Sequence, residues 1–408
     1  MKKLQLLNGC IASILLVMLF MTVGSSPVMA GDKDCLDPKW ADHPACADPV
    51  DPPPDPEPEN PGALCVDSGS SFPAFAYVFT GEIFLSNSEG DCSISIYKSD
   101  ELSANISYRF FGNLETGNGS GKIVWSTRYF DFKLVGGFTR SRTLLLEFQA
   151  EAGAITTPLP LAPRLLLEEP ENFGNAFHPD LNLTGDKVII SAYELGEVRG
   201  YIWEFDIPES GSVAMEDVRV LTTLEVDEEQ GLDHATFHGP LYGLSDQRER
   251  IYFGYDYPDR KISYIEKVTD NLWSEPTLIT ERQDGALEPG SVGLWDFGTG
   301  PKEVLARSYT EDGIDFIEIL DVDACANNVG DCVIVDGIEG WDRSSFTTFT
   351  EGQLPALLYL FDVDARNVGY SIRECDLSIL QSGGTCYRTV ISGIKDPKRS
   401  LYGVDSAD

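Results

Sequence analysis

A pattern that returns about every sixty residues constrains the fold of this chain more than any other feature. Residues 177–180 (Phe-His-Pro-Asp) precede a polar turn and two apolar segments, at 188–192 and 200–206. Residues 237–240 (Phe-His-Gly-Pro) begin a similar series. Short apolar runs rich in Val, Ile, Tyr and Phe, separated by Gly, Asp, Asn and Pro, are typical of β-strands. No segment keeps a helical period for three turns, so the sequence predicts an all-β fold.

Further copies of the pattern occur on both sides of these two. Residues 295–320 and 349–372 repeat it, residues 75–97 form an earlier copy, and residues 111–132 form a blurred one. About six units of roughly 50 to 60 residues result, each with three or four antiparallel strands. One such sheet cannot bury both of its faces, so the units are expected to stack around an axis. The sequence therefore predicts a six-bladed β-propeller over residues 64–408. A β-sandwich or jelly roll also has closely spaced strands, but it gives no reason for a fixed interval.

The N-terminus has the features of an export signal. A charged start, Met-Lys-Lys, precedes an apolar run at residues 11–23 and small residues before Gly31. This order predicts a signal peptide over residues 1–30. The run is shorter than the about 20 residues of a membrane-spanning helix, and no transmembrane segment is expected after cleavage. A lipid anchor and an uncleaved N-terminal anchor are the alternatives, although Cys35 lies beyond the expected cleavage site.

Residues 31–63 have a different composition. A short acidic segment, which one disulfide could close, is followed at residues 48–61 by prolines that alternate with Asp and Glu. Proline restricts φ, and the carboxylates repel one another. We therefore expect an extended spacer without a core of its own.

The cysteine count supports export. Cys10 falls in the signal peptide, which leaves eight cysteines, and an even number in an exported chain predicts disulfides. Their spacing favours pairing between neighbours: Cys35 with Cys46, Cys65 with Cys92, Cys325 with Cys332, and Cys375 with Cys386. A periplasmic or secreted protein is expected.

The charge balance restricts the partners. The chain has 66 acidic and 30 basic residues and a net charge of −36. Such a surface repels nucleic acid and anionic lipid, which both bind to basic patches. No nucleic-acid partner is therefore expected. Cationic partners, divalent ions or a salty medium suit this surface, and a simple role in solubility also explains it.

The units carry further recurring residues. The aromatic-x-Pro-Asp turn at 177–180 is followed by a strand that ends in Ser191 and another that ends in Asp206, and residues 273–276 (Trp-Ser-Glu-Pro) form a fourth-strand ending. These units resemble the TolB-like six-bladed propellers of the bacterial periplasm. The resemblance covers about two thirds of the mature chain; the second copy lacks the turn aspartate, and the first, second and last units are degenerate. It implies a scaffold that binds a protein or a glycan, often without enzymatic activity.

Four residues are candidates for ligand binding near the mouth of the channel: His178, Asp180, His238 and Asp296. The two histidines are expected at equivalent positions of adjacent units, where a His/Asp rim could bind a ligand or a divalent ion. Alternatively, each histidine caps a turn by hydrogen bonding to the backbone. No cofactor is expected, and calcium is the metal that channel carboxylates could hold.

Two aspartates near a cysteine pair form a weaker pattern. Asp321 and Asp323 precede Cys325, but the spacing differs from that of an EF-hand loop and the terminal glutamate is missing. We expect a disulfide-closed hairpin at this position.

No catalytic residue is predicted. The sequence contains no Gly-x-Ser-x-Gly motif, and only about sixteen residues follow the last unit, too few for the hydrolase domain of a propeller peptidase. Glycoside hydrolysis needs only two carboxylates at a suitable separation, which the sequence cannot pair.

The sequence therefore favours an exported, non-enzymatic propeller that binds a protein or polysaccharide of the cell envelope through one face of its channel. The alternative is a propeller enzyme that acts on a carbohydrate or a lactone through channel carboxylates, with or without calcium.

Overall fold

The computed structural model describes residues between Cys65 and Ser406. The chain divides between Asn60 and Pro61, and every described residue belongs to the second unit, Pro61–Asp408. The described residues are 65, 71–79, 81–99, 106–130, 139–170, 173–194, 199–225, 237–245, 248–255, 261–270, 272–281, 289–296, 300–312, 314–327, 332–347, 356–362, 369–377, 379, 386–395 and 403–406.

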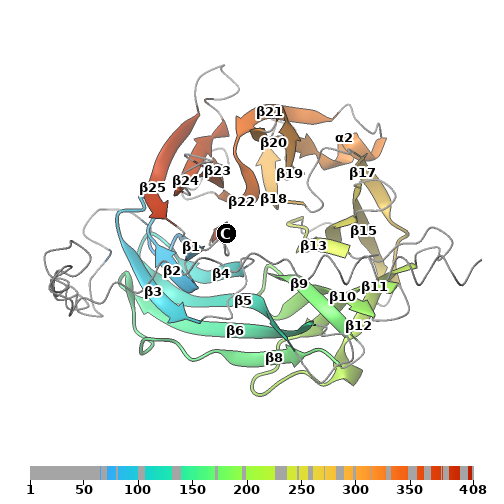
Figure 1. Ribbon diagram of the computed structural model, residues 1–408, viewed down its shortest axis with the longest axis horizontal. Helices are drawn as coiled ribbons and strands as arrows, with labels where there is room; N and C mark the ends of the chain where they lie inside the picture. Colours follow the sequence, from blue (N-terminus) through green and yellow to red (C-terminus); the bar gives the residue numbers. More distant parts are fainter. Residues whose placement is uncertain are drawn as a thin grey trace, which may run out of the picture. The chain divides into compact units, whose positions relative to one another are not determined.

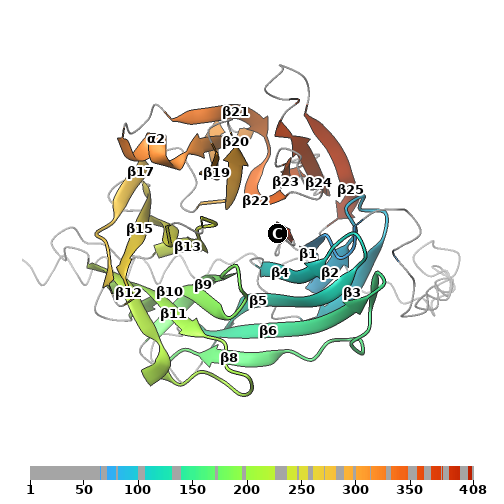
Figure 2. The same ribbon diagram turned by 180° about the vertical axis from the view of Figure 1, so that it is seen from behind.

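The described strands form six antiparallel sheets arranged in a ring (Figures 1 and 2), so the prediction of a six-bladed propeller is confirmed. The strands of each blade follow one another outward from the centre of the ring. In this order, blade 1 contains β26 (Gly403–Ser406), β1 (Phe75–Phe79), β2 (Glu82–Ser86) and β3 (Ser93–Lys98). Blade 2 contains β4 (Ile106–Asn113), β5 (Asn118–Phe130) and β6 (Thr139–Glu151), with both β7 (Ala154–Ile155) and β8 (Arg164–Glu168) paired to β6. Blade 3 contains β9 (Phe173–Leu181), β10 (Lys187–Glu194), β11 (Arg199–Asp206) and β12 (Arg219–Glu225).

The second half of the ring follows the same plan. Blade 4 contains β13 (Phe237–Tyr242), β14 (Arg250–Tyr255) and β15 (Lys261–Thr269), with both β16 (Leu272–Trp273) and β17 (Thr277–Glu281) paired to β15. Blade 5 contains β18 (Ser291–Asp296), β19 (Pro301–Glu311), β20 (Ile314–Asp321) and β21 (Val333–Glu339). Blade 6 contains β22 (Trp341–Thr347), β23 (Ala356–Asp362), β24 (Gly369–Asp376) and β25 (Tyr387–Lys395). Two short helices, η2 (Met215–Asp217) and α2 (Val322–Asn327), lie between the third and fourth strands of blades 3 and 5.

Each seam between neighbouring blades encloses its own apolar core. Six hydrophobic clusters occur among the described residues, and each combines side chains from two consecutive blades around the ring. Successive residues of a strand serve different seams: Ile190 of β10 faces blade 2, whereas Ile189 faces blade 4. Because side chains of a strand alternate between its faces, both faces of a blade must be apolar. The continuous burial of residues 188–193 reflects this.

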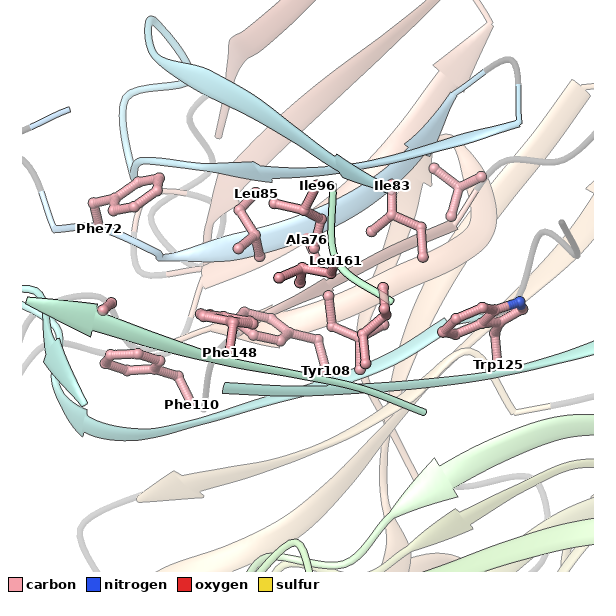
Figure 3. Packing of buried hydrophobic residues seen from close by; sticks show 14 of the residues in the cluster. Phe72, Ala76, Ile83, Leu85, Ile96, Tyr108, Phe110, Trp125, Phe148 and Leu161 are labelled. Carbon is pink, nitrogen blue, oxygen red and sulfur yellow. The ribbon is translucent and has the colours of Figure 1, made fainter. Parts of the chain in front are cut away.

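The seam between blades 1 and 2 contains the largest of these cores. Tyr108, Phe110 and Phe148 of blade 2 lie opposite Ile83 and Leu85 of blade 1 (Figure 3). Trp125, from β5, closes the same core at one end and is fully buried. Full burial of one such side chain stabilises a fold by about 1.5–3 kcal/mol. Apolar contact between blades is therefore the main source of stability that the ring offers.

The connections between strands separate into two sets. Because the strands of a blade are antiparallel, its first-to-second and third-to-fourth connections leave on one face of the ring, and the remaining connections leave on the other. Among the described residues, Cys92, Cys332 and Cys386 each directly precede the fourth strand of a blade, and they form disulfides with Cys65, Cys325 and Cys375. We call the face with these third-to-fourth connections the disulfide face and the other the opposite face.

The three disulfides occupy matching places in blades 1, 5 and 6. The second cysteine of each pair accepts, through its backbone oxygen, a hydrogen bond from the residue that ends or follows the third strand: Asn87 to Cys92 (3.1 Å), Asp321 to Cys332 (2.9 Å) and Asp376 to Cys386 (3.0 Å). The predicted pairs of neighbouring cysteines are confirmed in these three cases. The fourth pair, Cys35 with Cys46, lies outside the described residues.

The disulfide-closed hairpin expected at Cys325 is confirmed, because β20 and β21 are antiparallel neighbours and the Cys325–Cys332 disulfide closes their connection. This connection also contains helix α2, which was not predicted: the Asp321 carboxylate accepts a hydrogen bond from the Ala324 N–H (2.9 Å) and caps a helical turn. The predicted boundaries of two repeat units differ from those of the blades. The copy at residues 75–97 begins with the second strand of its blade, and blade 6 begins with β22 rather than near residue 349.

The last strand closes the ring, because β26 pairs with β1 in the blade that the first described strands begin. Removal of residues 403–408 should lower the midpoint of thermal unfolding by about 5 °C, since about four backbone hydrogen bonds, each contributing about 1 kcal/mol, are lost. Circular dichroism at increasing temperature measures this change. Removal of residues 407 and 408 alone is the control, and an equal midpoint for both truncations would contradict closure by β26.

Candidate functional site

Asp180 joins three blades near the centre of the ring. It lies on β9, the innermost strand of blade 3, and is 4% exposed. Its Oδ1 accepts a hydrogen bond from the Ser107 hydroxyl of blade 2 (2.6 Å), and its Oδ2 accepts one from the backbone N–H of Tyr242 in blade 4 (2.7 Å). The Ser107 hydroxyl oxygen in turn accepts a hydrogen bond from the Leu181 N–H (3.1 Å). One carboxylate thus fixes three inner strands relative to one another.

The burial of Asp180 changes its acidity. Loss of hydration raises the pKa of this carboxyl above its usual range, although the nearby Arg109 guanidinium and the hydrogen bonds from Ser107 and Tyr242 act in the opposite direction. The Arg109 Nη2 atom lies 4.0 Å from Oδ1. The carboxyl group is therefore poorly hydrated but well supplied with donors.

Tyr242 extends this network into the seam between blades 3 and 4. Its hydroxyl donates a hydrogen bond to Oε1 of Glu204 (2.9 Å), and the other carboxylate oxygen of Glu204 lies 2.9 Å from Nη2 of Arg219. Arg219 also pairs with Asp206 (2.8 Å). Burial, reinforced by the charge of Glu204, raises the pKa of Tyr242 well above its usual value. The phenol therefore stays a hydrogen-bond donor at any physiological pH.

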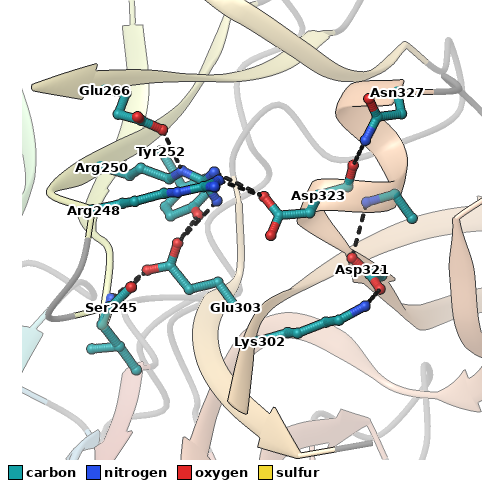
Figure 4. Close-up of polar contacts among 12 residues, drawn as sticks. Ser245, Arg248, Arg250, Tyr252, Glu266, Lys302, Glu303, Asp321, Asp323 and Asn327 are labelled. Atoms are coloured by element: carbon teal, nitrogen blue, oxygen red, sulfur yellow. Dashed lines mark hydrogen bonds and ion pairs between the residues drawn. The ribbon is translucent and has the colours of Figure 1, made fainter. Parts of the chain in front are cut away.

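Glu303 plays a comparable part between blades 4 and 5 (Figure 4). It lies on β19 and is 4% exposed. Its Oε1 accepts hydrogen bonds from the N–H groups of Leu244 (2.7 Å) and Ser245 (2.9 Å) of blade 4, and its Oε2 accepts one from the Tyr252 hydroxyl (2.6 Å). A Cβ atom on Gly243 would lie 2.6 Å from Oε1 of Glu303, so a larger residue there would require the Glu303 carboxylate to shift.

Arg250 completes the same cluster. Its side chain is 3% exposed and pairs with Glu303 (3.2 Å), with Glu266 of its own blade (3.1 Å) and with Asp323 of helix α2 (2.8 Å). Its guanidinium also lies over the ring of Tyr264, 4.6 Å from the centroid. Figure 4 shows the guanidinium directed toward these three carboxylates. A planar cation with five donors suits such a junction, because it can satisfy several acceptors at once.

The strand registers correct one prediction about the candidate residues. His178 and Pro179 form a bulge opposite Ile190, whereas in the next blade Gly239 and Pro240 form the bulge. His178 therefore corresponds to Gly239, and the expectation that His178 and His238 are equivalent is wrong. The match extends to the backbone, because φ is +53° at His178 and +50° at Gly239.

The remaining candidates lie apart from Asp180. His238 is near the start of β13, on the side of the opposite face, and its side chain lies outside the described part of the structure. Asp296 ends β18 in an exposed position, and its Oδ1 accepts a hydrogen bond from the Gly300 N–H (3.0 Å). Within the described ranges, no group of three His, Cys, Asp or Glu side chains is placed to hold a metal ion. A ligand role for His178, Asp180, His238 and Asp296, and calcium binding, stay predictions.

The sequence pointed to Asp180 but not to the larger cluster around Arg250. Asp180 stood out because it belongs to the recurring motif at residues 177–180, whereas Arg250 and Tyr252 on β14 and Glu303 on β19 have no recurring spacing. A weak signal was present, because Arg248 and Arg250 are close together in a strongly acidic chain. Only the register of the strands brings these residues together.

The chain was compared with known proteins. No family model matches it, and no curated protein matches it. Among solved structures, it is similar to an alpha-L-arabinofuranosidase from Fusarium graminearum in complex with an iminosugar inhibitor, at 11% identity and a TM-score of 0.46, over 82% of this chain and 89% of that chain. A puromycin-hydrolyzing peptidase from Mycobacterium tuberculosis gives 11% identity and a TM-score of 0.40, over 82% of this chain and 55% of that one. An apocarotenoid oxygenase mutant from Synechocystis gives 10% identity and a TM-score of 0.40, over 81% and 73%. These likenesses assign no activity to this chain.

In the ranges that the structure describes, no helix is both long enough and apolar enough to cross a bilayer.

Replacement of Asp180 by Asn should destabilise the fold by about 2 kcal/mol, because one amide group cannot accept hydrogen bonds at both positions. Chemical denaturation measures this change. Asp296→Asn, at an exposed turn, is the matched control and should stay within about 0.5 kcal/mol of the wild type.

The same pair of variants tests the acidity of Asp180. Because its folded-state pKa is raised, the folded chain binds this proton more tightly than the unfolded chain does. The stability of the wild type relative to Asp180→Asn should therefore decrease as the pH rises above about 4 and through the raised pKa. A difference that is constant with pH, or that increases, would show that the carboxyl is not desolvated.

Replacement of Glu303 by Gln should destabilise the fold by about 3 kcal/mol, because the amide nitrogen of Gln cannot accept the hydrogen bonds that one of the two buried carboxylate oxygens accepts. Glu266→Gln removes a more exposed partner of the same guanidinium and should change the stability by less than about 1 kcal/mol. Equal effects of the two substitutions would mean that burial does not set the strength of this cluster.

Proposed function

We propose that the propeller is an exported, non-enzymatic scaffold that binds a protein or polysaccharide of the cell envelope through its opposite face. The single observation that supports this most is the use of the buried carboxylates. Asp180, Glu204 and Glu303 each accept hydrogen bonds from a neighbouring blade; they lie on the first, third and second strands of their own blades. Such groups hold the ring together and are poor candidates for a nucleophile or an acid/base pair.

The distribution of the disulfides supports the choice of face. Three covalent cross-links fasten connections on the disulfide face, at blades 1, 5 and 6. A disulfide reduces the conformational freedom of the connection that it closes. The connections of the opposite face have no such cross-link among their described residues, and binding residues are commonly carried by loops that a rigid scaffold positions.

We also propose a periplasmic or secreted location for this scaffold. This location goes with a signal peptide over residues 1–30, a spacer within residues 31–63 and TolB-like units. Three disulfides among the described residues fit an oxidising compartment. No metal is required for this function.

Two measurements on the full chain, purified from an export host, test this function. The first measures whether the chain binds immobilised envelope polysaccharides or can be cross-linked to envelope proteins. Backbone hydrogen exchange of the chain is then compared with and without the bound partner. Exchange should slow in the opposite-face connections and stay unchanged in the disulfide-face segments 207–218 and 272–276. The second is turnover of chromogenic glycosides and of lactones, which should not occur. Catalytic release of sugar, or opening of a lactone ring, would overturn the non-enzymatic role in favour of the propeller-enzyme alternative.

A further inference from the structure

The seam between blades 6 and 1 is the one at which the ring closes. Blade 1 combines β26, from the end of the chain, with β1, β2 and β3, from its beginning. Strand β26 is joined to β1 by backbone pairing and not by a chain connection. If this pairing breaks, blades 6 and 1 can separate without the rupture of a covalent bond. The other five seams lie between blades that follow one another directly in the chain.

Apolar side chains fill part of this closing seam. Phe75 and Tyr77 of β1 belong to one hydrophobic cluster with Ile372 of β24 and Val390 of β25. Strand β25 is the outermost strand of blade 6, and it lies next to blade 1 in both views of the ring (Figures 1 and 2). The outer edge of blade 6 therefore takes part in the closing contact.

A guanidinium group crosses the same seam at the disulfide face. Arg388, near the start of β25, lies 2.6 Å from Oε2 of Glu89 and donates a hydrogen bond to the backbone oxygen of Ser88 (3.1 Å). Both of these partners belong to the connection between β2 and β3 of blade 1. The Arg388 Nε atom also pairs with Glu374 of its own blade (2.5 Å). An isolated exposed ion pair contributes little to stability, whereas a network with several acceptors contributes measurably.

The backbones of the two blades also come close at this point. Gly90 has a φ of +74°, and a Cβ atom on it would lie 2.4 Å from the backbone oxygen of Val390. A larger residue would therefore strain the turn and push it against β25. Arg388, Glu374 and the turn at residues 87–92 thus form one contact, which we call the outer latch.

A contact of the same kind occurs between blades 2 and 3. Arg164 begins β8, an outer strand of blade 2, and pairs with Glu147 of its own blade (3.0 Å). It also donates hydrogen bonds to the backbone oxygens of Pro208 (2.9 Å) and Gly211 (3.3 Å), in the third-to-fourth connection of blade 3. In both places, an arginine of an outer strand reaches the next blade at the disulfide face.

Disulfides distinguish the outer latch from the contact of Arg164. Cys92 ends the turn of blade 1 and is bonded to Cys65. Cys386 lies two residues before Arg388 and is bonded to Cys375. Each side of the outer latch is therefore held by a covalent bond to a second segment of the chain. Blades 2 and 3 contain no cysteine, so the contact between them has no such bond.

We propose that the outer latch is a redox-dependent closure of the ring. A disulfide limits the conformations that are open to the segment it closes. With both bonds formed, Arg388 and the turn at residues 87–92 are held where they meet. With either bond reduced, one of the two sides gains conformational freedom and the contact becomes weaker. The ring then opens first at this seam, because no chain connection holds β26 to β1.

The chemistry of the disulfides links closure to the compartment. Each bond forms by exchange, in which two cysteine thiols pass two electrons and two protons to a disulfide oxidant that becomes two thiols. A reducing interior keeps cysteines as thiols, whereas an oxidising exterior supports the bonds. In an exported chain, the closing seam is therefore weak before export and fastened after it.

Backbone hydrogen exchange of the full, oxidised chain under native conditions tests the latch. The readout is the exchange rate in β26 and β1 divided by the mean rate in β10 and β14, and this ratio should be close to one in the wild type. Arg388→Asp places a carboxylate beside Glu89 and Glu374 and should raise the ratio about 10-fold, because attraction becomes repulsion. Arg164→Asp is the matched control, since it meets Glu147 and two carbonyl oxygens in the same way, and should leave the ratio close to one.

Removal of either disulfide beside the closing seam should have a similar effect. Cys65→Ala/Cys92→Ala and Cys375→Ala/Cys386→Ala should each raise the ratio about 5- to 10-fold. Addition of Arg388→Asp to either pair should raise it by less than about 3-fold more, because the latch is already weakened. If one of these cysteine pairs is required for folding, the other gives the same test. Cys325→Ala/Cys332→Ala, which removes the disulfide of blade 5, should leave the ratio close to one and the effect of Arg388→Asp complete.

Three results would overturn the proposal. An unchanged ratio in Arg388→Asp would show that the outer latch does not hold the closing seam. An equal rise after removal of the blade 5 disulfide would show that disulfides stabilise the ring as a whole. A complete effect of Arg388→Asp in both chains that lack a disulfide beside the closing seam would show that the latch does not depend on the redox state.

Discussion

The structure depends on the fact that a small antiparallel sheet with two apolar faces cannot shield both of them alone. Strands such as β10 and β19 are buried on both sides along most of their length. Each face must therefore meet another blade, and the chain satisfies all twelve faces only by forming a closed ring of six. The six apolar clusters, one in each seam, are the direct result. The last strand has to return to the first blade because an open ring would leave two faces exposed.

The polar contacts of the seams add specificity to this apolar packing. Apolar contacts alone do not fix the position of one blade along the ring axis relative to the next blade. Asp180 and Glu303 do fix it, because they accept hydrogen bonds from specific backbone N–H groups of the neighbouring blade. Carboxylates buried in this way are retained only where nearly all of their acceptor sites are used. Because their oxygens are already used by the fold, these carboxylates support the proposed binding role.

The sequence predicted much of the architecture and little of the site. The recurrence of aromatic residues and short strands was enough for six blades, and close cysteine spacing was enough for three disulfides. A bulge of two residues moved His178 into correspondence with Gly239, and no pattern of residue types reports a shift of one position. Helix α2 was missed because its cap, Asp321, resembled a loop residue. The Arg250 cluster joins strands of two blades, with Arg250 and Glu303 53 residues apart, and only the register of the strands places them together.

Native-state hydrogen exchange of the unliganded chain tests the central claim most directly. If the blades depend on one another through their seams, the amides of Tyr242, Leu244 and Ser245, which donate to carboxylates of neighbouring blades, should exchange only through global unfolding, at the same rate as strand amides of all six blades. Blades that exchange as separate units, with these three amides among the fastest, would contradict it.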